Sequence, residues 1–167
     1  PIELDRDSEK YGYITTTPKL AWRDCDIVGQ MQEALHCPVG FDTDVNGSVL
    51  GEVTFGQAQG KKCVMYLTIG TGVGGGIYSN GELHHGMLHP ETVMTVSPEM
   101  IILGGGVMHQ EQLFPLIRKK LKEYINGYIV TDELADMEHY VVPASLHDDQ
   151  GIMGCLELAR RALENDH

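Results

Sequence analysis

Basic residues and long apolar runs are both scarce in this sequence. Its 167 residues contain 12 Lys and Arg against 24 Asp and Glu, so the formal net charge at pH 7 is -12. Nucleic acids and anionic membranes attract Lys and Arg, and the acidic balance therefore disfavours both as partners. No apolar run approaches the ~20 residues of a membrane-spanning helix, and the polar opening PIELDRDSEK shows no signal peptide. We expect a cytoplasmic protein, and a start at Pro1 indicates missing upstream sequence.

Paired cysteines are also lacking. Cys25, Cys37, Cys63 and Cys155 are widely spaced, and no CxxC or CxC pattern occurs. Because disulfide frameworks and structural zinc sites need matched cysteine pairs, this chain alone predicts neither. We expect four free thiols that are buried in the protein interior.

The pattern of apolar residues indicates an α/β fold. Hydrophobic residues make up 42% of the chain, which suits one domain or one lobe of a larger enzyme. Helical spacing and short apolar runs alternate along the sequence. The expected helices cover 24–36, 45–58, 110–124 and 150–163, and the expected strands cover 38–41, 63–69, 100–103 and 140–142. Asn80-Gly81 is a strong signal for a hairpin turn.

The glycine-rich segment LTIGTGVGGGI, Leu67–Ile77, is the first candidate binding motif. Glycines let backbone N–H groups approach a phosphate, and Thr71 adds a hydroxyl donor. Gly70, Gly72 and Gly75 match the dinucleotide pattern GxGxxG, but that pattern needs a following helix, and a hairpin is expected instead. We therefore predict a phosphate-binding turn, with a purely structural glycine turn as the alternative.

The segment FDTDVNG, Phe41–Gly47, stands at an expected strand-to-helix junction. A sugar hydroxyl is a poor nucleophile, and a carboxylate aimed at it can take its proton during attack on a γ-phosphoryl group. Asp42 and Asp44 are both candidates for this base, and Asn46 is a candidate to hydrogen-bond a sugar hydroxyl. On spacing alone, an Asp at a helix start is more often an N-cap than a catalyst.

Two weaker patterns complete the candidates. In Met100–Met108, MIILGGGVM, a strand followed by three glycines would let a flat base or ribose lie close to the backbone, although such a strand end is often only a tight turn. His84, His85, His89 and Glu91 form a cluster in which metal ligation is conceivable. Without nearby cysteines, such histidines are more often exposed to solvent or in contact with substrate.

Taken together, these motifs resemble the ROK sugar kinases, and within them the fructokinase branch. The segments YGYITTTPKLAW, PVGFDTDVNGSVLGE, LTIGTGVGGG, HHGMLHPE and SPEMIILGGGVM occur in family order and span nearly the whole chain. The resemblance implies the two-lobe actin/hexokinase-like (ASKHA) ATPase fold, with ATP bound between the lobes. It also implies Mg²⁺-dependent phosphorylation of a hexose at its terminal hydroxyl and a homodimer.

The resemblance also assigns roles to individual residues. Asp44 matches the catalytic base, which outweighs the N-cap alternative. The family's sugar-contacting positions correspond to Thr43, Asn46 and Glu91. The ATP contacts match Gly70, Thr71 and Gly72 on the phosphate side and Gly104, Gly105, Gly106, Val107 and Met108 on the adenosine side.

Two departures from the family pattern make the chain incomplete. The family's N-terminal phosphate hairpin is absent, and Glu91 runs directly into TVMTVSPEM where the family has a zinc loop and several helices. This chain therefore holds no zinc ligands of its own, and zinc is expected only if the missing segment is present. We expect residues 1–60 to be the remainder of the N-terminal lobe, 61–150 the C-terminal lobe, and 151–167 a helix that packs back on the first lobe. Whether these segments are missing from the protein or only from this stretch of chain stays open, and an intact mass would decide it.

The sequence therefore predicts ATP-dependent phosphorylation of D-fructose to fructose 6-phosphate. A kinase for another hexose, such as glucose or mannose, is the nearest alternative, because contacts in the pocket decide specificity. A sugar-sensing repressor of the same family and an inactive fragment are the others. The acidic charge argues against DNA binding.

Overall fold

A computed structural model describes residues 2–17, 19–85, 98–127 and 130–164. The chain divides into two compact units, one of Pro1–Thr43 with Cys155–His167 and one of Asp44–Gly154. The sequence-based lobe boundaries at 60 and 150 refer to the lobes of the parent enzyme, and they stay a prediction. In the described part of the chain, no helix is long and apolar enough to cross a membrane.

The first unit contains a small antiparallel ribbon and a helix. Strand β1 (Tyr13–Ile14) pairs with β2 (Cys25–Asp26), and the short 3₁₀ helix η1 (Leu20–Trp22) lies between them in sequence. Helix α1 (Ile27–Leu35) starts three residues later than expected, because Cys25 and Asp26 belong to the ribbon. The Asp26 carboxylate caps this helix by accepting the Gly29 N–H at 2.8 Å.

The strand expected at 38–41 is wrong, because this segment has no regular structure. Pro38 has no N–H to donate to a strand ladder. Gly40 lies against the backbone of helix α6 (Gln150–Glu164), where an added Cβ would stand 2.5 Å from the Leu158 carbonyl oxygen. The segment is therefore fixed by close packing rather than by strand pairing.

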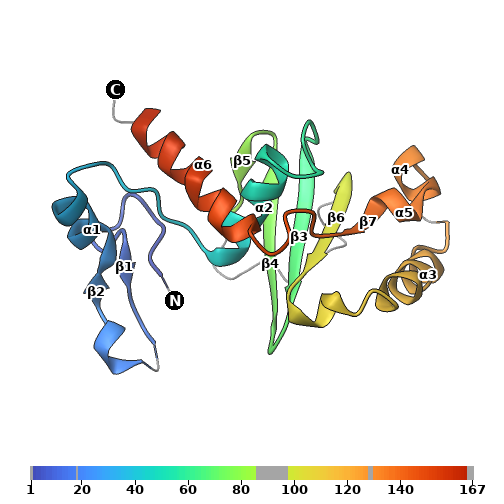
Figure 1. Cartoon of the computed structure of the whole chain (residues 1–167), viewed down its shortest axis with the longest axis horizontal. Coiled ribbons are helices and arrows are strands. Elements are labelled where there is room, and N and C mark those ends of the chain that lie inside the picture. Colours follow the sequence, from blue (N-terminus) through green and yellow to red (C-terminus); the bar gives the residue numbers. More distant parts are fainter. Residues whose placement is uncertain (1, 18, 86–97, 128–129, 165–167) are drawn as a thin grey trace. The chain divides into compact units, whose positions relative to one another are not determined.

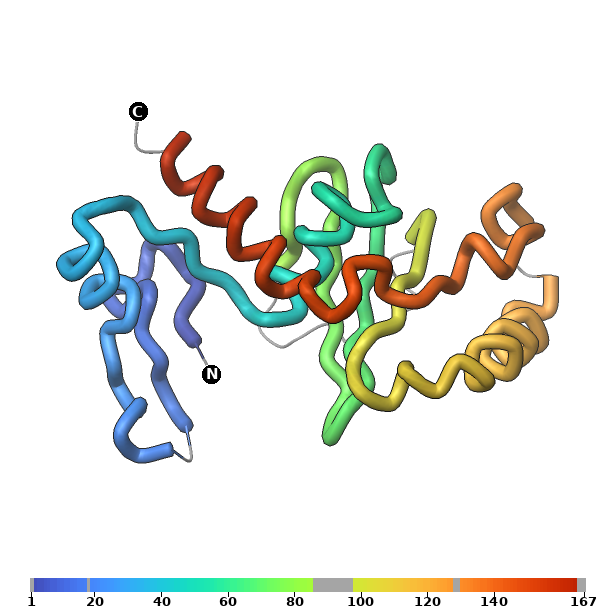
Figure 2. The backbone as a smooth tube through the Cα atoms, viewed as in Figure 1, coloured from blue at the N-terminus to red at the C-terminus, as the bar shows by residue number. Residues whose placement is uncertain are grey.

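The second unit is built on a five-stranded mixed sheet (Figures 1 and 2). The strand order is β5-β4-β3-β6-β7, with β3, β6 and β7 parallel and with β4 antiparallel to both β3 and β5. The strands are β3 (Cys63–Ile69), β4 (Val73–Ser79), β5 (Glu82–Leu83), β6 (Met100–Gly104) and β7 (Val141–Pro143). The three strands predicted over this region and the hairpin turn at Asn80-Gly81 are confirmed.

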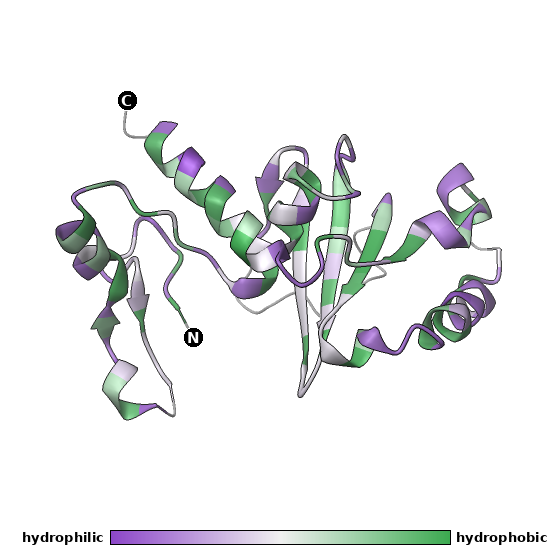
Figure 3. Cartoon of the chain, viewed as in Figure 1, coloured by the Kyte–Doolittle hydropathy of each residue, from purple (hydrophilic) through white to green (hydrophobic). Residues whose placement is uncertain are grey.

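Alternate residues of the central strands face two separate apolar clusters, and apolar colour follows β3 and β6 in Figure 3. Val64, Tyr66 and Ile102 belong to the cluster that includes Val49 of helix α2 (Asp44–Thr54). Ile101 and Leu103 belong to the cluster on the other face, with Phe114 and Tyr140. Strand β6 is buried along its whole length, as expected for a parallel strand that is covered on both sides.

The remaining helices of this unit follow β6. The 3₁₀ helix η3 (Gly106–His109) precedes α3 (Leu113–Ile125), so the helix expected from residue 110 begins three residues late. Two short helices, α4 (Asp132–Ala135) and α5 (Met137–Tyr140), lead into β7. The four cysteines are free thiols, as expected, but none of them is buried, and Cys37 and Cys155 are exposed.

Candidate active site

The expected catalytic carboxylate stands at the start of α2. Asp44 is the first residue of this helix, and Thr43 occupies the preceding position where capping side chains usually stand. Asp44 is exposed, whereas Asn46 in the same turn is only 4% exposed. A substrate hydroxyl can therefore reach the Asp44 carboxylate at the start of the helix.

Glycines in β4 let the first turn of α2 lie directly on the sheet. A Cβ added to Gly76 would stand 2.5 Å from the Val45 carbonyl oxygen, and one added to Gly74 would stand 3.0 Å from Val45 Cγ1. Two glycines of the LTIGTGVGGGI motif therefore have a packing role. They set the position of Val45, and with it that of the neighbouring Asp44.

The glycines of the turn between β3 and β4 have no such role. The Gly70 N–H donates to the Gly72 carbonyl at 2.9 Å, and all three residues of the turn, Gly70, Thr71 and Gly72, are exposed. Within the described residues, no atom lies within 4 Å of a Cβ built at Gly70 or Gly72. Protein packing thus does not explain these two glycines, whereas the approach of a ligand to their backbone would.

The third glycine motif turns sharply at the end of β6. A Cβ on Gly104 would stand 2.0 Å from the Tyr66 hydroxyl oxygen, and one on Gly105 would stand 2.7 Å from the Ile69 N and O atoms. Gly105 also has φ +88°, a conformation that L side chains rarely adopt. Both glycines are therefore required by the fold. The Cβ position of Gly106 is free of described neighbours.

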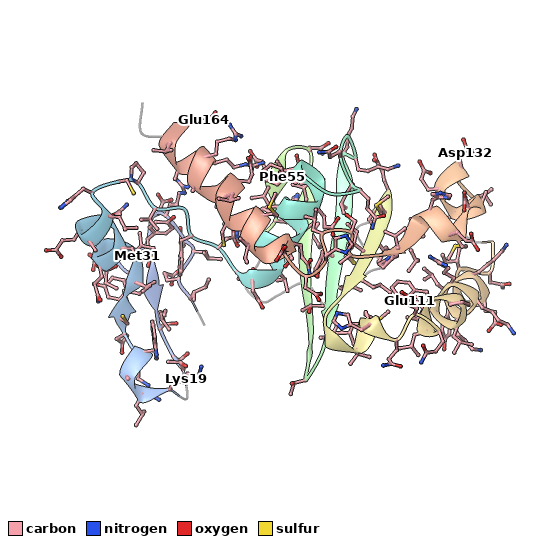
Figure 4. All side chains as sticks on the ribbon, viewed as in Figure 1. Lys19, Met31, Phe55, Glu111, Asp132 and Glu164 are labelled. Carbon is pink, nitrogen blue, oxygen red and sulfur yellow. The ribbon has the colours of Figure 1, made fainter. Side chains whose placement is uncertain are left out.

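An open cavity of about 640 Å³ lies at the carboxyl ends of β6 and β7. Gly104, Gly105 and Met108 line it, while Gly106 and Val107 belong to the same turn but are not lining residues. Its opposite wall is the loop between β7 and α6, and Glu111, which Figure 4 labels, also lines it. Crevices at the carboxyl ends of parallel strands are the usual ligand sites of α/β sheets.

The loop wall of this cavity has an unusual backbone. His147 and Asp148 both have positive φ, 50° and 72°. The Asp148 carboxylate lies 3.2 Å from His109 Nε2 on η3, so an exposed pair links the two walls. Consecutive non-glycine residues in the left-handed region are uncommon, and sequence patterns did not indicate them.

One row of the sheet joins the three predicted motifs. Thr68 pairs with Gly74 on one side and with Gly104 on the other. Gly74 contacts Val45 next to Asp44, and Gly104 lines the cavity. Since neighbouring strands are about 4.8 Å apart, Gly74 and Gly104 are separated by about 10 Å. The helix start, the open turn and the cavity are therefore neighbours at one end of the sheet.

Some predicted residues are not placed at this site. Thr43 is adjacent to Asp44 in sequence but belongs to the first unit. His89 and Glu91 lie outside the described residues, and His84 and His85 are the last described residues before that gap. Among the residues that the structure describes, no group of three or more His, Cys, Asp or Glu side chains could hold a metal ion.

Polar groups inside the second unit were not predicted from the sequence. Gln150 Nε2 donates to the Tyr66 hydroxyl at 3.0 Å, and burial raises the pKa of Tyr66. Glu52 is fully buried on α2 and accepts two hydrogen bonds from Ser145. An acidic residue between Gly51 and Val53 in a helix of small and apolar residues is the one signal that could have drawn attention to Glu52.

Comparison with known proteins identifies relatives along the whole chain. The sequence model of the ROK family matches residues 2–92 and 90–162. The fructokinase of Pediococcus pentosaceus is 32% identical over 230 positions, covering 99% of this chain and 79% of that protein. The fructokinase of Zymomonas mobilis is also 32% identical over 230 positions, covering 97% and 75%. A xylose repressor of Bacillus subtilis is 33% identical over 87 residues, 52% of this chain and 22% of the repressor.

These alignments also locate the departure from the family pattern. An alignment of 230 positions against a chain of 167 residues leaves at least 63 positions of the relative without a counterpart. The two matches to the family meet at residues 90–92. Both observations agree with an internal segment that is absent between Glu91 and Thr92.

Solved structures share the fold. The ROK hexokinase of Thermus thermophilus superposes with a TM-score of 0.71 at 18% identity, covering 86% of this chain and 72% of that one. The ROK glucokinase of Streptomyces griseus, solved with glucose and AMPPNP, gives a TM-score of 0.67 at 18% identity, covering 92% and 78%. The architecture is thus the actin/hexokinase-like α/β fold, and the chain belongs to the ROK family.

Proposed function

We propose that the parent enzyme phosphorylates D-fructose at its 6-hydroxyl with ATP. The observation that carries this proposal is the row Gly74–Thr68–Gly104, which makes the start of α2, the open glycine turn and the cavity neighbours. A base, a phosphate-binding turn and a nucleotide pocket are the parts that phosphoryl transfer to a hydroxyl needs. Two fructokinases at 32% identity over nearly the whole chain support fructose as the sugar.

In this proposal Asp44 is the general base. Its carboxylate takes the proton from the sugar hydroxyl while the hydroxyl oxygen bonds to the γ-phosphorus and the bond to the β-phosphate oxygen breaks. Thr43 and Asn46 hold the sugar, together with Glu91 beyond the described residues. Asn46 is nearly buried, so only a small part of its side chain would be accessible to the sugar.

The nucleotide occupies the open turn and the cavity. The turn Gly70–Gly72 contacts the phosphates through the N–H groups of Thr71 and Gly72, because the Gly70 N–H already donates to the Gly72 carbonyl. Hydrogen-bond donors there stabilise the charge that develops during transfer. The turn that starts at Gly104 and ends at Met108 contacts the adenosine. The glucokinase solved with AMPPNP supports ATP as the phosphate donor for this fold.

Magnesium is the expected metal cofactor, because it is usually held by substrate phosphates with one or two carboxylates rather than by a protein cage. Bound Mg²⁺ would neutralise part of the phosphate charge. Zinc is tied to the family segment that is absent between Glu91 and Thr92, and no step is assigned to it. We also propose a cytoplasmic homodimer with hexose and ATP as its small-molecule partners.

The proposal has three alternatives, two of which follow from the relatives. The glucokinase solved with glucose makes another hexose the nearest alternative. The xylose repressor matches about half of this chain, so a sugar sensor without phosphoryl transfer is the second, and an inactive fragment is the third. A sensor would bind sugar and leave ATP unchanged.

The test is release of ADP by the complete protein, meaning the natural gene product that contains these 167 residues. Fructose, glucose, mannose and xylose are compared at equal concentrations with ATP and Mg²⁺. We expect the highest kcat/KM with fructose. A higher kcat/KM with glucose or mannose would transfer the proposal to that sugar, and sugar binding without ADP release would favour the sensor.

A further inference from the structure

Glu52 is a buried carboxylate that the proposed reaction does not use. It is fully buried on α2, two residues before the helix ends at Thr54. The carboxyl end of a helix carries a partial negative charge, which disfavours an anion there. Burying a carboxylate also costs free energy unless its oxygens are hydrogen-bonded. Glu52 therefore depends on hydrogen-bond donors from elsewhere in the fold.

Both carboxylate oxygens of Glu52 are bound by one residue, Ser145. The Ser145 N–H donates to Oε1 at 2.6 Å, and the Ser145 hydroxyl donates to Oε2 at 2.6 Å. The Gln57 N–H donates to the Ser145 hydroxyl oxygen at 3.0 Å, and its side-chain amide donates to the Pro143 carbonyl. Gly56 makes room for this arrangement, because a Cβ there would stand 2.2 Å from Oε2.

Ser145 lies in the loop from β7 to α6, which Figure 2 traces from orange to red. The cavity is lined by Ala144, His147 and Asp148 of this loop, on either side of Ser145, and by Pro143 at the end of β7. Glu52 therefore ties one end of α2 to the wall of the proposed nucleotide pocket. The other end of the same helix carries Asp44.

We propose that Glu52 and Ser145 are positioning residues that hold the nucleotide pocket in register with the helix that carries the base. The proposal rests on the function proposed above. Two hydrogen bonds from one residue fix both the distance and the orientation of the loop, which a single bond or an apolar contact would not do. In-line phosphoryl transfer depends on such positioning.

Stability alone does not require a carboxylate at this position. Neutral or apolar side chains that fill the same space are often as stabilising as a buried charged group, or more so. A carboxylate that accepts two short hydrogen bonds from one loop residue fixes the orientation of that loop. The direct consequence is that loss of the Ser145 hydroxyl should affect nucleotide binding more than sugar binding.

The experiment uses the complete protein with Ser145→Ala, Ser145→Thr and Glu52→Gln, and with Glu123→Gln as the matched control. Glu123 is an exposed carboxylate on α3 that pairs with Lys120 and does not line the cavity. Calorimetry gives the Kd of AMPPNP and of fructose, steady-state assays give the KM of ATP and of fructose, and thermal melting gives Tm.

We expect Ser145→Ala to raise the Kd of AMPPNP and the KM of ATP by roughly 10- to 100-fold, the range that corresponds to one lost hydrogen bond to a charged group. The corresponding fructose values should stay within about twofold. Ser145→Thr, which keeps the hydroxyl, should recover most of the nucleotide affinity. Glu52→Gln keeps one acceptor and should lie between these two, and Glu123→Gln should match the wild type.

Three results would overturn the proposal. Unchanged nucleotide affinity with a lower Tm would make the pair purely structural, and equal weakening of both ligands would remove the link to the nucleotide side. Failure of Ser145→Thr to recover would show that the hydroxyl is not the active feature. If the wild type binds AMPPNP but transfers no phosphate, the proposed function fails, while the calorimetric comparison still tests the pair.

Discussion

Replacing Gly76 by alanine should displace the helix that carries the proposed base. The added Cβ would stand 2.5 Å from the Val45 carbonyl oxygen and 3.1 Å from the Asn46 nitrogen, and both are backbone atoms. Contacts under 3.0 Å essentially do not occur and ordinary contact begins at 3.4 Å, so β4 and α2 must separate by about 0.5–0.9 Å. Overpacking of this kind typically costs about 1–3 kcal/mol of stability, and a shift of ~1 Å at a catalytic group can cost ~10²-fold in rate.

Gly72→Ala is the matched comparison, because no described atom lies within 4 Å of its Cβ position. The assays are the free energy of unfolding in denaturant and kcat/KM for ATP, both on the complete protein. We expect Gly76→Ala to lose stability and kcat, and Gly72→Ala to keep its stability but lose affinity for ATP. Wild-type stability of Gly76→Ala, or unaltered ATP kinetics of Gly72→Ala, would refute this division of the motif into packing and ligand-facing glycines.

Three further predictions concern other parts of the chain. Thr71→Val should raise the KM for ATP more than that for fructose, since the proposed phosphate donor is lost while the shape is kept; a weakened fructose KM with unchanged ATP kinetics would place the turn on the wrong ligand. Hydrogen bonds from Arg160 and then Arg161 hold the pKa of Glu157 at about 2, below its ordinary 4.5. The stability that the ionised Glu157 contributes is therefore present above about pH 4.5 and is lost as the pH falls toward about 2. In thermal melts, the Tm difference between wild type and Glu157→Gln should shrink between about pH 5 and pH 3. A constant Tm difference would contradict the ion pairing. A protein made as these 167 residues, joined between positions 91 and 92, should release no ADP with fructose. It should also be poorly soluble, because Leu35, Ile152 and other apolar side chains of α1 and α6 are exposed. Turnover within tenfold of the complete protein would show that the absent segment is dispensable.

Local patterns were sufficient to predict most of the second unit. The strand at 63–69 follows from its apolar run, and the turn at Asn80-Gly81 follows from backbone preference alone. Helix ends were less accurate because neighbours decide them. The helix expected from residue 45 to 58 ends at Thr54. Beyond this end, the Gln57 N–H donates to the Ser145 hydroxyl oxygen instead of continuing the helix.

The site was predicted in its parts but not in its connections. The glycine motif was identified as one unit, whereas the structure separates Gly74 and Gly76, which pack on α2, from the open Gly70 and Gly72. That division depends on the position of α2, and the spacing of glycines within the motif carries no information about that position. Likewise, Glu52 and Ser145 are 93 residues apart, and no local pattern relates them.

The most direct test of the account is single-turnover transfer of phosphate from ATP to fructose by the complete protein and its Asp44→Asn variant. The amide keeps the size of the carboxylate but cannot accept the proton, so the rate should fall by ~10²–10⁴-fold. Fructose binding, measured by calorimetry, should stay within about twofold. The account predicts fructose 6-phosphate as the wild-type product. Wild-type transfer by Asp44→Asn would contradict it, and would return Asp44 to a purely structural role at the start of α2.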